Sequence, residues 1–226
     1  MIMSLAVTQL VGFGCKRASA ASGPSLSYQS SNNTNTSATS HTFTSQSIGA
    51  EGANRAIVVV VGYYTGASAT LSSATIGGTS ATITNQVLGT SNGSAIIIAA
   101  VSSGTTATIV LNWSANAQGI SVAVYRVVDL VSVTAHASST DTGTPASLTV
   151  NVPANGIIIA GSATIDGSPT VPSSWVGPVG DGSQTVGGAS AAAWASNSYA
   201  SAQTPLTVSV TVPGSRSSLV AASWGN

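Results

Sequence analysis

Apolar and polar residues alternate along much of this chain with a period of two. In the segment 206–212 (LTVSVTV), Leu and Val occupy every second position and Thr or Ser the positions between. The segment 148–152 (LTVNV) repeats the pattern. A period of two sends one set of side chains to a core and the other to water, as in a β-strand. Such segments recur about every ten residues, a spacing that is typical of a β-sandwich.

Three short runs are apolar at every position. They are 57–61 (IVVVV), 96–98 (III) and 157–159 (III). Strands with two buried faces have this composition, so the runs predict central strands. They are too short to span a bilayer, which excludes a transmembrane helix built from them. At a sheet edge, such low-charge β-prone segments would promote aggregation.

Glycine-containing dipeptides between the strand signals predict tight turns. Gly77-Gly78 lies between two runs rich in Thr and Ile, and Asn92-Gly93 precedes another strand signal. Two-residue hairpin turns favour these dipeptides because the residues of such turns need positive φ angles, which Gly and Asn tolerate. We therefore expect a β-hairpin at each dipeptide.

The pattern repeats once along the chain, with a period near 100 residues. Segment 41–62 resembles 146–161, and 95–127 resembles 189–224. The predicted fold is an all-β, antiparallel, jelly-roll-like β-sandwich built from two related halves. The preferred division is an extended N-terminal arm (residues 1–23) and one sandwich domain (residues 24–226), because no linker interrupts 127–133. The alternative is two tandem sandwiches, 24–128 and 129–226.

Composition narrows the range of functions. Only 4% of the residues are charged, against about a quarter in an average domain, and the net charge is +0. Binding of nucleic acid needs several cations, and the only adjacent pair is Lys16-Arg17, so no nucleic-acid partner is expected. Cys15 is the single cysteine, which excludes an intrachain disulfide and a cysteine zinc cluster. A near-neutral surface gives little colloidal repulsion, which favours a place in an assembly.

The N-terminal arm differs in kind from the rest. Its apolar residues precede Lys16 and Arg17, the reverse of the order in a secretory signal, although a cleaved signal ending near residue 20 is the alternative. A free apolar arm would associate nonspecifically, so we expect it to be held by a partner. The hypothesis is that Leu10 and Phe13 dock against a neighbouring copy or capsid lattice, with Lys16 and Arg17 at the rim. The alternative is an arm folded onto its own sandwich.

No catalytic constellation is evident. Asp141-Thr142-Gly143 spells the aspartic-protease triplet, but that chemistry needs two carboxylates, and a polar segment precedes it, so a turn is preferred. His41 and His136 lie in no metal-spaced cluster and are expected to be exposed. Asp166-Gly167 and Asp181-Gly182 could hold calcium weakly, but solvated turns are preferred. We expect no enzyme, no cofactor and no metal site.

The tryptophans suggest a further binding role. Trp113, Trp194 and Trp224 lie in or beside apolar strands, which predicts core packing. Trp175 lies in a segment rich in Pro, Gly and Ser, which predicts a loop. It is the candidate for an exposed contact with a ligand such as a sugar.

The overall pattern resembles a known family. The similar segments are 5–14 (LAVTQLVGFG), 54–61 (NRAIVVVV), 74–81 (ATIGGTSA), 152–158 (VPANGII) and 219–225 (LVAASWG). They resemble segments of jelly-roll-like β-sandwich virion structural proteins of tailed bacteriophages. The resemblance implies a protein on the virion surface, as a capsid decoration, head fibre or tail component.

Partners and location follow from the same resemblance. It implies contact with the major capsid protein or with copies of this chain as a homo-oligomer, while the short apolar runs predict no membrane partner. The alternative is a secreted, extracellular carbohydrate-binding or adhesin module. Such a module would stack sugars on Trp175.

Overall fold

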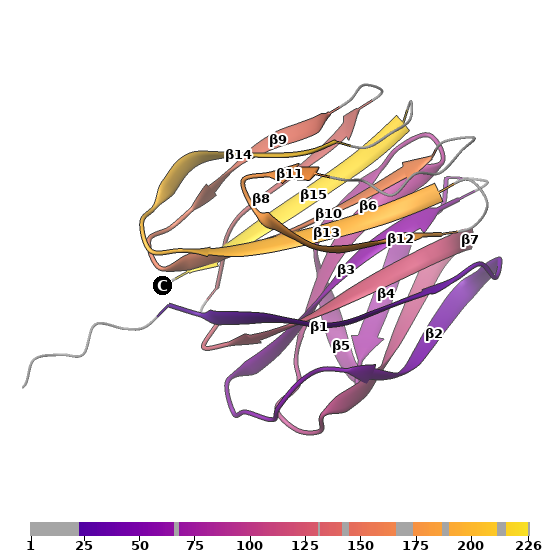
Figure 1. The fold of residues 1–226 in the computed structure, drawn as a ribbon. Coiled ribbons are helices and arrows are strands. Elements are labelled where there is room, and N and C mark those ends of the chain that lie inside the picture. The colour runs from indigo at the N-terminus through magenta and orange to yellow at the C-terminus, as the bar shows by residue number, and fades with distance from the viewer. Residues whose placement is uncertain are drawn as a thin grey trace, which may run out of the picture.

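A computed structural model describes residues 23–65, 68–130, 132–141, 145–165, 174–186, 190–211 and 216–225 (Figure 1). Strands and their connections account for all of these residues, without a helix among them, and every strand pairing is antiparallel. The predicted all-β, antiparallel class is confirmed.

The strands fall into two sets along the chain. The first set is β1 (Ser25–Thr34), β2 (Ala38–Ser47), β3 (Arg55–Tyr64), β4 (Leu71–Ile76), β5 (Thr79–Leu88), β6 (Asn92–Ala100) and β7 (Thr106–Val128). The second set is β8 (Ser132–Asp141), β9 (Ala146–Val152), β10 (Gly156–Ile165), β11 (Ser174–Val176), β12 (Val179–Thr185), β13 (Ser190–Tyr199), β14 (Gln203–Thr211) and β15 (Arg216–Gly225). We call these sets the first and second halves.

Both halves repeat one pairing scheme. In the second half, β12-β13-β10-β15-β8 form a five-stranded sheet and β11-β14-β9 a three-stranded sheet. In the first half, the C-terminal part of β7 pairs with β1 and β3, and its N-terminal part pairs with β2 and β4. Strand β7 therefore takes the places of both β14 and β15. The related halves predicted from the sequence have the same topology, while both proposed domain divisions stay predictions.

The sheets stack as four layers with three apolar cores between them (Figure 1). The first core lies inside the first half, and the third core lies inside the second half. The middle core joins the five-stranded sheet of the second half to a five-stranded layer of the first half, which is formed by β1, the C-terminal part of β7, β3, β6 and β5. It contains Val58, Val60 and Tyr125 from the first half and Ile159, Trp194 and Trp224 from the second. The halves thus bury apolar surface against each other, which stabilises both.

The three apolar runs form central strands, as predicted. Strand β3 lies between β7 and β6, β6 between β3 and β5, and β10 between β13 and β15. Alternation along β3 sends Ile57, Val59 and Val61 to the first core, and Val58 and Val60 to the middle core. These positions are apolar throughout because both faces of the strand are covered.

Strands β3 and β10 cross the middle core against each other at equivalent positions. An alignment of Asn54 with Asn155 pairs Val60 with Gly161 and Gly62 with Ala163. In space, a Cβ on Gly161 would overlap the Val60 side chain, and a Cβ on Gly62 would lie 3.4 Å from that of Ala163. Each strand therefore touches its own counterpart, as expected for two halves related by an approximate twofold axis along these strands.

The two dipeptide turns differ in outcome. Gly77 and Gly78 connect β4 to β5 with φ angles of 59° and 79°, so this hairpin is confirmed. At the second dipeptide, β5 and β6 do form a hairpin, but the predicted turn residues are wrong, because Asn92 and Gly93 are buried residues of β6 and the chain turns at 89–91. The Asn92 amide Nδ2 donates a 2.7 Å hydrogen bond to the Ala163 carbonyl of the other half. This buried partner explains the asparagine better than a turn does.

Candidate functional site

The residues of the predicted arm contact are not among those that the structure describes. Leu10, Phe13, Lys16 and Arg17 lie outside the described residues, as do Cys15 and Asp166. Their role in binding a partner stays a prediction.

Trp175 lies in the short strand β11 rather than in a loop. Alternation exposes Ser174 and Val176 and leaves Trp175 half-buried against the third core. Gly180 of β12 lies over the indole, where a Cβ would come within 3.0 Å of Cδ1. Part of the ring is therefore covered by the protein, and its role as a ligand contact stays a prediction.

The other tryptophans belong to the cores, as predicted. Trp113, Trp194 and Trp224 are 5%, 2% and 0% exposed. Trp113 packs against Tyr63 with ring centroids 4.5 Å apart.

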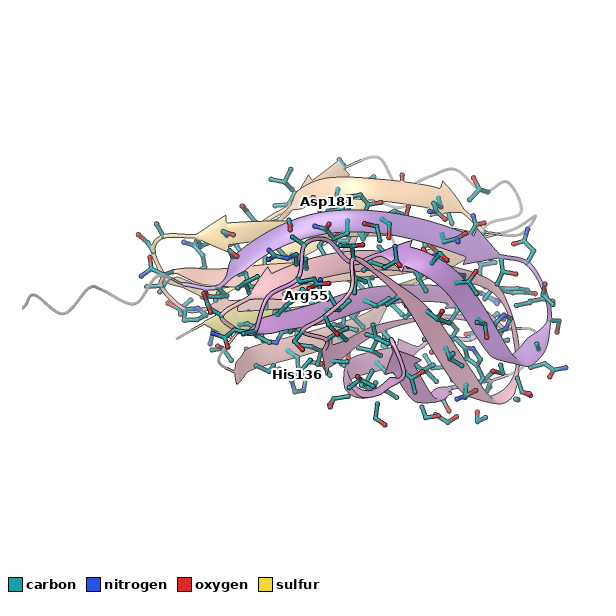
Figure 2. All side chains as sticks on the ribbon, turned by 90° about the horizontal axis from the view of Figure 1, so that it is seen from below. Arg55, His136 and Asp181 are labelled. Atoms are coloured by element: carbon teal, nitrogen blue, oxygen red, sulfur yellow. The ribbon has the colours of Figure 1, made fainter. Side chains whose placement is uncertain are left out.

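The two histidines have different environments. His136 is exposed on β8, as predicted, and in the view of Figure 2 it lies on the opposite side of the molecule from Asp181. His41 is buried, so the prediction for it is wrong. Its Nε2 lies 3.2 Å from the Ala38 carbonyl and 3.0 Å from that of Ala117. These atoms lie where the β2–β7 register shifts, so the imidazole contacts polar main-chain groups at that irregularity.

Asp141 is the last residue of β8, opposite Ser217, rather than part of a turn. Thr142 and Gly143 lie outside the described residues. Within the described part of the chain, no group of three His, Cys, Asp or Glu side chains is placed to hold a metal ion. The same residues include no helix long and apolar enough to cross a membrane.

The Asp181 carboxylate accepts two side-chain hydrogen bonds at the junction of the halves. It lies at a β-bulge of β12, where the register against β13 shifts between Gly180 and Gly182, so the solvated turn predicted there is wrong. Its Oδ2 accepts a 2.9 Å hydrogen bond from the Tyr125 hydroxyl and a 2.6 Å hydrogen bond from Ser196 Oγ. Tyr125 belongs to the first half and Ser196 to the second. The carboxylate therefore links the halves.

Burial shifts the pKa values of both Asp181 and Tyr125. It raises the pKa of Asp181 above its ordinary value, although the hydrogen bonds from Ser196 and Tyr125 act in the opposite direction. It also raises the pKa of Tyr125 well above its usual value, and the nearby Asp181 charge adds to the rise. Tyr125 therefore stays a neutral donor, and Asp181 is the group that titrates.

The rings of Tyr28 and Trp194 lie beside Tyr125, and together with Asp181 and Ser196 these residues form one cluster. Tyr28 of β1 packs edge-on against Tyr125 at 5.7 Å between centroids, and stacks with an offset on Trp194 at 6.4 Å. Gly182, next to Asp181, lies over the indole, where a Cβ would come within 2.9 Å of Nε1. The cluster thus combines one carboxylate and three aromatic rings at the junction of the halves.

Arg55 is a second buried polar feature that the sequence did not predict. Its side chain, 2% exposed, donates to five main-chain carbonyls, those of Val101, Gly49, Ala50, Ser103 and Gly104. Its role is structural, since the guanidinium joins the loop before β3 to the loop after β6. A lone arginine directly before an apolar run was the available signal.

No protein-family model matches this chain, and no curated protein matches it significantly. The resemblance to phage virion proteins therefore stays an interpretation of the sequence.

Proposed function

We propose that this chain is a structural protein of a bacteriophage particle, a capsid decoration protein that binds through a neutral sheet face. The observation that carries the proposal is the outer face of β9 and β14. Its exposed side chains are short and uncharged: Ser147, Thr149, Asn151, Thr207 and Thr211. Within the described residues, these side chains make no hydrogen bonds.

Such a face is suited to burial in an assembly. Short hydroxyl side chains lose little conformational entropy when ordered, and no ionised group must be dehydrated. Next to this face on β11, Val176 is 59% exposed, and Val179 at the start of β12 is 62% exposed. Together they supply apolar surface beside the hydroxyl groups, as at the core of a protein interface.

The equivalent face of the first half is less available. Ser40 Oγ donates to Asn112 Oδ1 at 2.8 Å, and Asn112 Nδ2 donates to Ser73 Oγ at 3.1 Å. These side chains already satisfy one another. The second half is therefore the proposed binding side, and the arm with Phe13 and Lys16 would add a second attachment.

The first test is mass spectrometry of purified phage particles, which should detect this chain at a high copy number. The second uses purified protein and particles that lack the chain. Thr207→Glu should abolish binding because it places a charge in the buried face, whereas Thr42→Glu on the outer face of β2 should bind normally. Absence from particles, or normal binding of Thr207→Glu, would count against the proposal.

The arm is tested separately by deletion of residues 2–22. The truncated chain should melt cooperatively but bind particles more weakly than the full chain. Equal binding would remove the arm from the proposal and leave the sheet face in it.

A further inference from the structure

The two five-stranded layers meet along two edges, and different strands and contacts join them at each edge. On one side, β5 packs against β8 and β15, and Asn85 Nδ2 donates a 2.6 Å hydrogen bond to the Ala137 carbonyl. On the other side, β1 faces β12 and β13, and Asn33 Nδ2 reaches the Thr185 carbonyl at 3.1 Å. Tyr28 lies at this second edge, which we call the β1–β12 edge.

Tyr28 offers an aromatic surface to solvent at the β1–β12 edge. It is 37% exposed, whereas its two ring neighbours, Tyr125 and Trp194, are 0% and 2% exposed. Contacts with these two buried rings restrict the rotamers available to Tyr28. The accessible part of its ring is therefore held in place before any ligand arrives.

The Asp181 carboxylate beside this cluster has no cationic partner among the described residues. Oδ2 accepts from two neutral hydroxyls, and Oδ1 accepts no hydrogen bond from the described part of the chain. Two arginines of the first half have hydrogen-bond partners elsewhere. Arg55 donates to five carbonyls, and Arg126 Nε donates to the Ala50 carbonyl at 2.8 Å.

We propose that Tyr28 and Asp181 form a binding site for an alkylammonium cation at the β1–β12 edge. An aromatic face attracts a cation through its quadrupole, and a half-buried carboxylate adds the charge complement. A neutral ligand would leave the carboxylate without a counter-charge, so the chemistry favours an ammonium group. The site is independent of the proposed attachment through β9 and β14.

Two sources could supply this cation. One is a free alkylammonium compound or a lysine of another protein. The other is Lys16, the only lysine of this chain, from the same copy or a neighbouring one. The test distinguishes these sources.

The experiment uses the full chain, ¹³C-labelled on its tyrosine rings, with tetramethylammonium chloride as the probe. Tyr28→Phe assigns the Tyr28 resonance in the NMR spectrum. We expect this resonance to shift saturably with the probe, and not with tert-butanol, a neutral molecule of similar shape. Sodium chloride at the same ionic strength is the salt control.

The variants test the two groups separately. Asp181→Asn keeps a hydrogen-bond acceptor for Tyr125 and Ser196 but removes the charge, and should weaken binding about tenfold. Tyr28→Ala should weaken it to a similar extent, and if that variant does not fold, Asp181→Asn still decides the result. Asp129→Asn is the matched control, because this exposed carboxylate accepts a 3.0 Å side-chain hydrogen bond from Asn54 and no other from the described residues, and binding should be unchanged.

Lys16→Gln identifies the source. If Lys16 occupies the site, this variant shifts the Tyr28 resonance without probe and binds tetramethylammonium more tightly than the natural chain. If the cation is external, both chains bind the probe equally. The proposal is overturned if neither chain shows a saturable shift, if tert-butanol produces the same shift, or if Asp181→Asn binds as well as the natural chain.

Discussion

The two halves share one strand-pairing scheme, but they differ in the corner that precedes a central strand, β3 in the first half and β10 in the second. The residues that stabilise this corner are chemically different. In the first half, the Arg55 amide donates to the Gly52 carbonyl at 3.1 Å, and in the second half the Gly156 amide donates to the Pro153 carbonyl at 3.0 Å. The turns are therefore equivalent. The Arg55 side chain reaches five loop carbonyls, whereas at Gly156 a Cβ would lie only 2.7 Å from the Pro153 carbonyl oxygen.

The residues that specify the strand order are therefore distinct from the residues that fill this corner. The alternating strands and buried runs occur in both halves, so they specify the strand order. The corner can be filled by a cation or left to the main chain. Substitutions in the first core, at this corner and where the two halves touch test this separation.

The largest effect is expected at the centre of the first core. Val59→Asp buries an unpaired carboxylate, which costs several kilocalories per mole even after relaxation. We expect no folded protein, as judged by the loss of a cooperative thermal transition in circular dichroism. A soluble Val59→Asp variant that melts cooperatively would mean that β3 is not central.

Arg55 should be the next most sensitive position. Arg55→Met keeps much of the apolar stem but deprives several buried carbonyls of a charged donor, which should lower the free energy of unfolding by at least about 3 kcal/mol. Urea denaturation measures this loss. Arg126→Ala, at a more exposed guanidinium, should cost less than about 1 kcal/mol, and an equal loss in both variants would refute the role given to Arg55.

The contact between equivalent strands is tested by a double-mutant cycle. Gly161→Ala alone should destabilise by about 1–3 kcal/mol, because its methyl group overlaps Val60. In a Val60→Ala background the same change should cost much less, since the space is then free. Additive losses in urea denaturation would show that the two residues do not share this space.

A pair of serines compares the two sides of the twofold arrangement. Ser94 Oγ and Ser218 Oγ are 2.8 Å apart, whereas the buried Ser121 hydroxyl, at the position equivalent to Ser218, has no hydrogen-bond partner within the described part of the chain. Ala192, equivalent to Ser94, offers no hydroxyl. Ser94→Ala should cost about 1 kcal/mol, and Ser121→Ala should be neutral or slightly stabilising. The reverse order of stabilities would contradict the hydrogen-bond assignment.

Asp181 should give the smallest effect at neutral pH and a characteristic pH dependence. Because folding raises its pKa, the contribution of this carboxyl is present below its unfolded pKa and is lost as the pH rises through the folded value. Relative to Asp181→Asn, the natural chain should therefore be most stable in acid and lose that advantage towards neutrality. Urea denaturation of both proteins between about pH 3 and pH 7 measures the difference. A gain in the relative stability of the natural chain with rising pH would contradict this sign.

The sequence predicted the strands better than their polar contacts. Periodicity was sufficient for β9, β14 and the three buried runs, because it reports which faces are covered. The surroundings of His41 and Asp181 depend on register irregularities in β2 and β12, and periodicity carries no record of a bulge. The sequence predicts Asn92 to be a turn residue because the hydrogen-bond partner of its side chain lies in the other half, 71 residues away.

The Val60–Gly161 contact has an evolutionary consequence. In a symmetric homodimer, a residue on the twofold axis meets its own copy, so any side chain there must fit against itself. One continuous chain is free of that condition and can place a large residue opposite a vacant one. If these halves arose by gene duplication of a dimer-forming ancestor, the axis is where the copies could diverge first, and Val opposite Gly is a difference that a homodimer could not have.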